Sequence, residues 1–185
     1  MIRIFSTAIA LLLLLTCMPV FGQEATLNIK TVTNTRDDLL LFLDVEGAFT
    51  QEMEEAILSG VQATFTFIIT LEKVRGFWWN TQITDQELMH EIKYDNLKKE
   101  FSITRPWESE NPTITKSFDE AKRLMTQIDS LKIAPLDILE KGQRYQIRAK
   151  AELGKITLPF YLHYVLFFVS LWDFETDWHT IDFIY

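Results

Sequence analysis

Apolar and polar residues alternate one by one from Tyr145 to Leu153, a period of two that places successive side chains on opposite faces of a β-strand. Ala63–Leu71 repeats this pattern with a single break at Ile68. Other segments show weaker alternation or, in one case, a run that is apolar on both faces: Thr26–Thr33, Leu39–Val45, Leu88–Tyr94, Leu97–Ile103 and Trp172–Trp178. The sequence therefore predicts seven strands, with a further short one around Thr113–Thr115.

Two segments have helical spacing instead. Thr50 is placed to cap a helix whose apolar side consists of Met53, Ala56, Ile57 and Val61. Ser117 and Glu120 form a capping box, in which each side chain satisfies a backbone N–H of the first turn. The apolar stripe of this second helix follows at helical spacing: Ala121, Leu124, Met125, Ile128 and Leu131.

The order of these elements argues against a parallel, doubly wound sheet, because strands do not alternate regularly with helices. We expect a mainly β fold with two helices (α+β), built on antiparallel sheets in a two-layer sandwich-like domain. The alternative is an open α+β sheet with both helices on one face. A length of 185 residues and the lack of internal repeats indicate a single domain.

Residues 1–22 have the anatomy of a secretory signal peptide: Arg3, an apolar run over Ala8–Leu15, and Gly22 before an expected cut at Gln23. The apolar run is short for a membrane span. The sequence thus predicts a signal peptide over 1–22, a domain over 23–185, and export to the periplasm or cell envelope. The alternative is an uncleaved anchor in the inner membrane. The one cysteine, Cys17, lies within this segment, so the mature chain has none.

Several function classes find no support in the sequence. A formal net charge of −8 argues against a nucleic-acid partner, since phosphate contacts need clustered basic residues. The six glycines do not cluster into a phosphate-binding loop, and neither a nucleophile elbow nor a zinc-protease motif occurs. We therefore expect no cofactor, no metal and no catalytic residue, and predict that the protein is not an enzyme.

Acidic residues concentrate in the predicted strand near the C-terminus. If this segment is extended, four ionisable side chains project from one face of it: Asp173, Glu175, Asp177 and His179. The favoured interpretation is a solvated acidic face opposite buried aromatic residues. Calcium binding and general acid–base chemistry on envelope polymers are the alternatives, although side chains diverge along a straight strand.

Two aromatic segments are candidates for binding. Phe77, Trp78 and Trp79 follow a strongly predicted strand. Adjacent tryptophans could contact a protein or stack on a sugar. Because large aromatic residues are more often buried, we favour a position in which they plug the end of the core. Leu158–Trp172 is uncharged and aromatic, and it contains Phe167 and Phe168. Core packing is favoured for that segment, and a partner surface or membrane contact are the alternatives.

Five phrases, in order, resemble the DUF4390 family, a domain of unknown function found in exported bacterial proteins. They are Ala56–Val61 before Phe65, Tyr94–Leu97 with Phe101, Ser117-Phe118 before Ala121, Tyr145–Arg148, and Ile156–Pro159. The resemblance covers Ala25 to Trp178. It implies a small secreted or envelope-associated protein without assigned activity, cofactor or catalytic residue, in some cases encoded near nitrogen-type sensor kinases. At Gly60-Val61-Gln62 the chain departs from the family pattern, in which a proline often follows.

Taken together, these features predict an exported, non-enzymatic envelope protein that binds an envelope or membrane protein, such as the extracytoplasmic part of a sensor. A small-ligand or glycan-binding module using Trp78 and Trp79 is the first alternative. A carboxylate-based envelope hydrolase is the second. Membrane contact through residues 1–22 or 158–172 stays open beside these.

Overall fold

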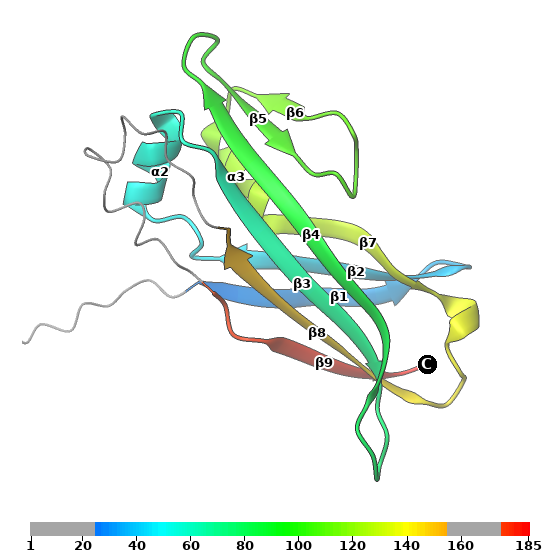
Figure 1. Ribbon diagram of the computed structural model, residues 1–185. Coiled ribbons are helices and arrows are strands. Elements are labelled where there is room, and N and C mark those ends of the chain that lie inside the picture. The colour runs from blue at the N-terminus through cyan, green and yellow to red at the C-terminus, as the bar shows by residue number, and fades with distance from the viewer. Residues whose placement is uncertain (1–24, 155–174) are drawn as a thin grey trace, which may run out of the picture.

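The computed structural model describes residues 25–154 and 175–185, which form two antiparallel sheets with two α-helices (Figure 1). The three-stranded sheet has the order β1-β2-β7, and the six-stranded sheet the order β6-β5-β4-β3-β8-β9. The strands are β1 (Thr26–Asn34), β2 (Asp38–Glu46), β3 (Ala63–Lys73), β4 (Thr81–Asp95), β5 (Glu100–Thr104), β6 (Thr113–Thr115), β7 (Gln127–Pro135), β8 (Arg144–Leu153) and β9 (His179–Ile184). The helices are α2 (Gln51–Leu58), α3 (Phe118–Thr126) and the 3₁₀ turn η1 (Leu136–Ile138).

The core lies between the two sheets. Phe65 and Phe67 of β3 and Ile147 and Ala149 of β8 are fully buried. Arg148, between the last two, is partly exposed, whereas Thr66, between the two phenylalanines, is buried as well. Leu41 of β2 closes the core from the three-stranded sheet. The predicted fold class is confirmed: the domain is mainly β, with two antiparallel sheets in a sandwich-like arrangement, and the single open sheet is wrong.

The strands of the two sheets cross one another instead of running side by side (Figure 1). Both helices lie toward the end of the six-stranded sheet that carries the turn between β4 and β5. The long hairpin of β3 and β4 extends the other way, and its tip projects beyond the neighbouring strands (Figure 1). The two ends of this sheet are therefore very different surfaces.

Most predicted strands coincide with observed ones. The segments beginning at residues 26, 39, 63, 88 and 145 lie within β1, β2, β3, β4 and β8, and the short segment at 113–115 is β6. The strand predicted over Leu97–Ile103 begins only at Glu100, because residues 96–99 form the turn. In that turn the Asp95 carboxylate accepts the backbone N–H groups of Leu97 and Lys98.

The second helix is shorter than predicted. It ends at Thr126, and the chain continues directly into β7, which the sequence analysis missed. Ile128 and Leu131 satisfy helical spacing, but in the structure they pair with Leu43 and Leu41 of β2. Sheet pairing buries the same two side chains that a longer helix would have buried. Pairing with β2 therefore determines that this segment is a strand and not a helix.

The last strand is displaced from its predicted position. In the described part of Trp172–Trp178, Glu175 makes one isolated bridge to Glu152, and regular pairing with β8 starts only at His179. The prediction of a strand over 172–178 is therefore wrong for residues 175–178, and β9 was missed. Thr176 anchors this stretch: it is buried, and its hydroxyl accepts the backbone N–H of Ala151 at 3.0 Å.

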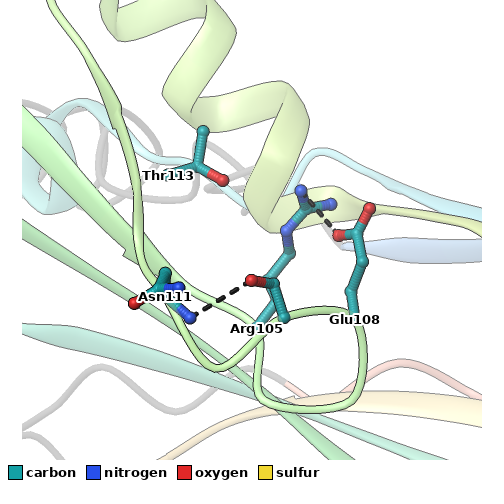
Figure 2. Close-up of a pocket in the computed structure, with 5 residues that line it drawn as sticks. Arg105, Glu108, Asn111 and Thr113 are labelled. Carbon is teal, nitrogen blue, oxygen red and sulfur yellow. Dashed lines mark hydrogen bonds and ion pairs between the residues drawn. The ribbon is translucent and has the colours of Figure 1, made fainter.

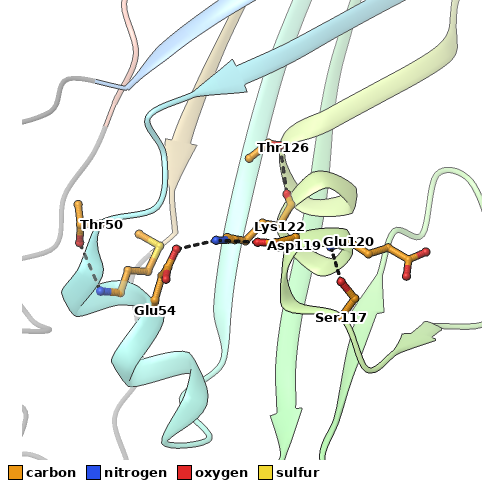
Figure 3. A network of polar contacts seen from close by, with 8 residues as sticks. Thr50, Glu54, Ser117, Asp119, Glu120, Lys122 and Thr126 are labelled. Carbon is orange, nitrogen blue, oxygen red and sulfur yellow. Dashed lines mark hydrogen bonds and ion pairs between the residues drawn. The ribbon is translucent and has the colours of Figure 1, made fainter.

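Polar side chains cap both helices and join them (Figure 3). The Thr50 hydroxyl accepts the N–H of Met53, which confirms the first predicted cap. Between the helices, the Lys122 ammonium lies 2.9 Å from the Glu54 carboxylate and 3.3 Å from that of Asp119. The hydrogen bond to Glu54, reinforced by Asp119, raises the pKa of Lys122.

We expect Ser117→Ala to lower the free energy of unfolding by about 1 kcal/mol, the usual cost of losing an N-cap. The Ser117 hydroxyl accepts the N–H of Glu120 at 3.2 Å, and alanine leaves that donor without its partner. Urea denaturation followed by circular dichroism measures the change. Ser117→Asp is the matched control: it keeps an acceptor at the cap and should preserve stability, so an equal loss in both variants would contradict the capping role.

Candidate functional site

The tip of the β3–β4 hairpin is held on a firmly paired base. The last register pair is Lys73 with Thr81, so residues 74–80 form the connection. Below it, the Lys73 ammonium lies 2.6 Å from the Glu140 carboxylate, and the Val74 N–H donates to the carbonyl of Arg144 at 2.9 Å. On the other side, the Asn80 amide donates to the Glu72 carboxylate at 3.0 Å. The base of the loop is thus tied both to β4 and to the segment that leads into β8.

Three consecutive aromatic side chains occupy this tip and face solvent. Phe77 is 98% exposed, Trp78 74% and Trp79 88%. The interpretation that they plug the core is therefore wrong, because the hairpin carries them past the end of the sandwich. The structure instead has the exposed position that the alternative interpretation required. We call Phe77, Trp78 and Trp79 the aromatic tip.

An open concavity of about 650 Å³ lies against the aromatic tip and is lined by Gly76 as well as the three aromatic residues. All four lining residues come from one loop. A Cβ placed on Gly76 would meet no atom within 4 Å, so this position has free space around it. Chemically, the tip offers aromatic faces and one adjacent positive charge, Arg75, which is also exposed.

In the described part of the acidic segment near the C-terminus, Glu175 and Asp177 are exposed to solvent, but residues 175–178 are not a continuous strand. Glu175 lies 2.5 Å from the Lys150 ammonium of β8, and this hydrogen bond raises the pKa of Lys150. Asp177 lies in the irregular stretch before β9, and His179 starts that strand. Asp173 lies outside the described residues. Because residues 175–178 are not a regular strand, the structure does not hold Glu175, Asp177 and His179 in one straight row.

Trp178 is in a different environment from the one expected. The sequence predicts buried aromatic residues opposite the acidic face, and Trp178 would be one of them, but it is 39% exposed. The Arg148 guanidinium lies 4.6 Å and the Lys150 ammonium 5.4 Å from the centre of its ring. Two cation–π contacts and the Glu175 ion pair thus fasten the chain onto the outer face of β8, which is a structural role.

His90 is a buried polar residue that the sequence analysis did not single out. Its Nε2 lies 2.8 Å from Nε1 of Trp107, and its Nδ1 lies 2.9 Å from the carbonyl oxygen of Met125. The indole N–H can only donate, so Nε2 accepts and the proton is on Nδ1, donated to Met125. Burial, followed by the nearby Arg105 charge, lowers the pKa of His90 to about 4.

A small polar pocket lies in the loop between β5 and β6, with a volume of about 300 Å³ (Figure 2). Arg105 and Glu108 form its charged wall, with their side chains 2.7 Å apart, and Asn111 and Thr113 lie opposite (Figure 2). Since the guanidinium is already paired with a carboxylate, the pocket presents no net charge for binding an ion. The aromatic tip is the stronger candidate site.

Comparison with protein families identifies the family to which the chain belongs. The model of the DUF4390 family, described as a domain of unknown function, matches residues 22–182. The chain belongs to this family. The predicted resemblance is thereby confirmed over nearly the whole domain. No curated protein and no solved structure matches the chain.

The matched range includes the β3–β4 hairpin and the first part of β9, so the aromatic tip is part of the DUF4390 domain. Over the described parts of this domain, His, Cys, Asp and Glu nowhere form a group of three that could hold a metal ion. In the same parts, every helix is too short or too polar to cross a membrane. Of the predicted binding residues, Phe167 and Phe168 lie outside the described residues, as does Leu158–Trp172.

Proposed function

We propose that this DUF4390 protein is an exported, non-enzymatic interaction module of the cell envelope, and that the aromatic tip is its contact surface. The observation that carries the proposal is the exposure of Phe77, Trp78 and Trp79 together at the end of a braced hairpin. Clusters of exposed apolar side chains are uncommon on soluble domains and usually mark an interaction site. Tryptophan is also the residue type most enriched in binding hot spots.

Placement in the envelope is supported by the sequence of residues 1–22. A basic start, an apolar run and a small residue before Gln23 form a secretory signal. The proposed location is the periplasm or the envelope surface that faces it, and an uncleaved segment would tether the same domain to the inner membrane. Both arrangements present the domain to envelope components.

A non-enzymatic role is supported by the contacts of Glu175, one of the carboxylates considered as a catalytic candidate. Glu175 is neutralised by Lys150, and this pair helps to hold the chain on β8. The Glu175 carboxylate is thus occupied by a structural contact with Lys150, which does not suit a catalytic acid or base. The proposed contact is therefore one that is made and released without chemical change, with an envelope component such as the membrane surface or the extracytoplasmic part of a membrane sensor.

Glycan or small-ligand binding is the second candidate, since exposed indoles are available to stack on a sugar ring. A sugar site also needs polar groups that fix the orientation of the ligand. The nearest amide, that of Asn80, is already bonded to Glu72. This makes the tip better suited to a broad apolar contact than to a directional one.

Site-specific photocrosslinking tests the proposal. A photoreactive benzoyl-phenylalanine replaces Trp79 in the exported chain, and the control places it at Leu97, which is 95% exposed at the opposite end of the six-stranded sheet. We expect adducts with envelope components at position 79 and none at position 97. Adding Phe77→Ser and Trp78→Ser should reduce the adducts about tenfold or more, as loss of a hot spot does. Equal labelling at both positions, or none at either, would overturn the proposal.

A further inference from the structure

We infer that the aromatic tip inserts into the interface of a zwitterionic phospholipid membrane, with Phe77, Trp78 and Trp79 at the level of the headgroups. This inference rests on the proposed function and names the surface that the same tip contacts. It follows from the chemistry of the three side chains, from the charge around them and from the shape of the hairpin.

The side chains suit the membrane–water boundary. Tryptophan combines a large apolar ring with one N–H donor, and it concentrates in proteins where hydrocarbon gives way to headgroups. Phe77, the most exposed of the three, has no polar atom and can reach deepest. Arg75, two residues earlier, is long enough to keep its guanidinium among phosphate groups while its carbon stem follows the apolar surface.

Charge sets the tip apart from the rest of the protein. The chain has a net charge of −8, but residues 74–80 contain one charged side chain, Arg75, and no carboxylate. An acidic body is repelled by anionic lipids, so electrostatic attraction cannot drive this contact. Binding through aromatic burial requires no anionic lipid, and it should depend little on salt.

The shape of the hairpin allows shallow insertion without disturbing the fold. Sheet pairing ends at Lys73 and Thr81, so the peptide groups of residues 74–80, apart from the Val74 N–H that donates to Arg144, still need water or headgroup partners. This restricts the tip to the interface and keeps it out of the hydrocarbon core. Because the tip projects clear of the sandwich, it can enter a membrane without bringing the acidic body with it (Figure 1).

A protein partner fits the same residues less well. A stable protein interface buries about 800 Å² on each side and surrounds its apolar centre with a polar rim. The aromatic tip is a single narrow turn, and the sheet ends behind it. A fluid interface closes around such a projection without needing a complementary pocket.

A fluorescent label beside the tip tests the inference. In the full chain, Cys17→Ser removes the native thiol and Gly76→Cys adds one where a Cβ has free space and where all three aromatic residues are kept. The thiol carries a polarity-sensitive nitrobenzoxadiazole dye, and the probe is a vesicle of pure phosphatidylcholine. The matched control carries the same dye at Leu97→Cys. Circular dichroism establishes that each labelled chain is folded.

We expect a several-fold rise and a shift to shorter wavelength in the emission at position 76 when vesicles are added, and no change at position 97. The signal should persist in about 1 M sodium chloride, where the screening length is about 3 Å. It should be lost when Phe77, Trp78 and Trp79 are all replaced by serine. Reading the label by position separates tip insertion from any attachment of residues 1–22 to the vesicle.

Three results would overturn the inference: no emission change at 76, equal changes at 76 and 97, or a change that survives replacement of the three aromatic residues. If vesicles give no signal at 76 while crosslinks at position 79 persist and contain protein, the tip binds a protein and the proposed function stands. If position 79 gives no adducts and the label gives no signal, both proposals fail.

Discussion

Phe67→Ala should lower the free energy of unfolding by about 3–5 kcal/mol, the usual cost of removing a phenylalanine from a packed core. Phe67 is fully buried at the centre of β3, and its ring lies 4.8 Å from that of His90. Its strand pairs on both sides, with β4 and with β8, so the neighbouring backbone has little freedom to close the cavity. Urea denaturation monitored by circular dichroism measures the change.

Phe77→Ala is the matched control for this variant. It makes the same substitution ten residues later on the same hairpin, where the ring is 98% exposed. We expect its stability to stay within about 0.5 kcal/mol of the unmodified protein, as for surface substitutions in general. Comparable losses in the two variants would contradict the assignment of Phe77 to a solvent-facing tip. A near-neutral Phe77→Ala would show that the residue is not needed for folding.

The sequence correctly predicted the features that depend only on residues close to one another in the chain. The alternation in Tyr145–Leu153 determines which side chains of β8 face the core, whatever strands flank it. The capping residues Thr50 and Ser117 were equally readable, because a cap depends on the next three residues alone. Two antiparallel sheets followed from the order of the elements.

Elements whose nature depends on distant partners could not be read in the same way. Ile128 and Leu131 fit a helix and a strand equally well, and pairing with β2 makes them a strand. The Thr180–Phe183 part of β9 does alternate, but the aromatic residues before it favoured an earlier strand. Both errors concern which strand a segment pairs with, and the local composition carries no information about that partner.

The prediction that the aromatic tip plugs the core was wrong for a related reason. The first half of β4, from Thr81 to Glu87, is mostly polar and gave no strand signal, so the hairpin itself was not recognised. Without it, burial statistics for large aromatic residues favoured a core position for Trp78 and Trp79. A usable signal was nevertheless present: Gly76 and Asn80 flank the aromatic residues as turn formers between two extended segments.

The stability of the protein should fall as the pH is lowered from 7 to 4, and His90 should account for about 3 kcal/mol of that loss. In the folded protein burial lowers the pKa of His90 to about 4, whereas the unfolded chain has the ordinary value of 6.5. Below pH 6.5 the unfolded state therefore takes up a proton that the folded state does not. The stability is fully present above that pH and is lost as the pH falls toward 4.

The hydrogen bonds of His90 also predict that protonation destabilises the folded protein. Trp107 donates its indole N–H to Nε2 of His90, so a proton on that nitrogen would place two donors against each other 2.8 Å apart. Carboxylates also titrate near pH 4, so the test compares two proteins: the unmodified chain and His90→Gln, whose amide does not titrate. Urea denaturation at a series of pH values gives the free energy of unfolding of each. The stability gap between them should shrink by about 3 kcal/mol from pH 7 to pH 4, and a constant gap would show that His90 is not held neutral by its burial.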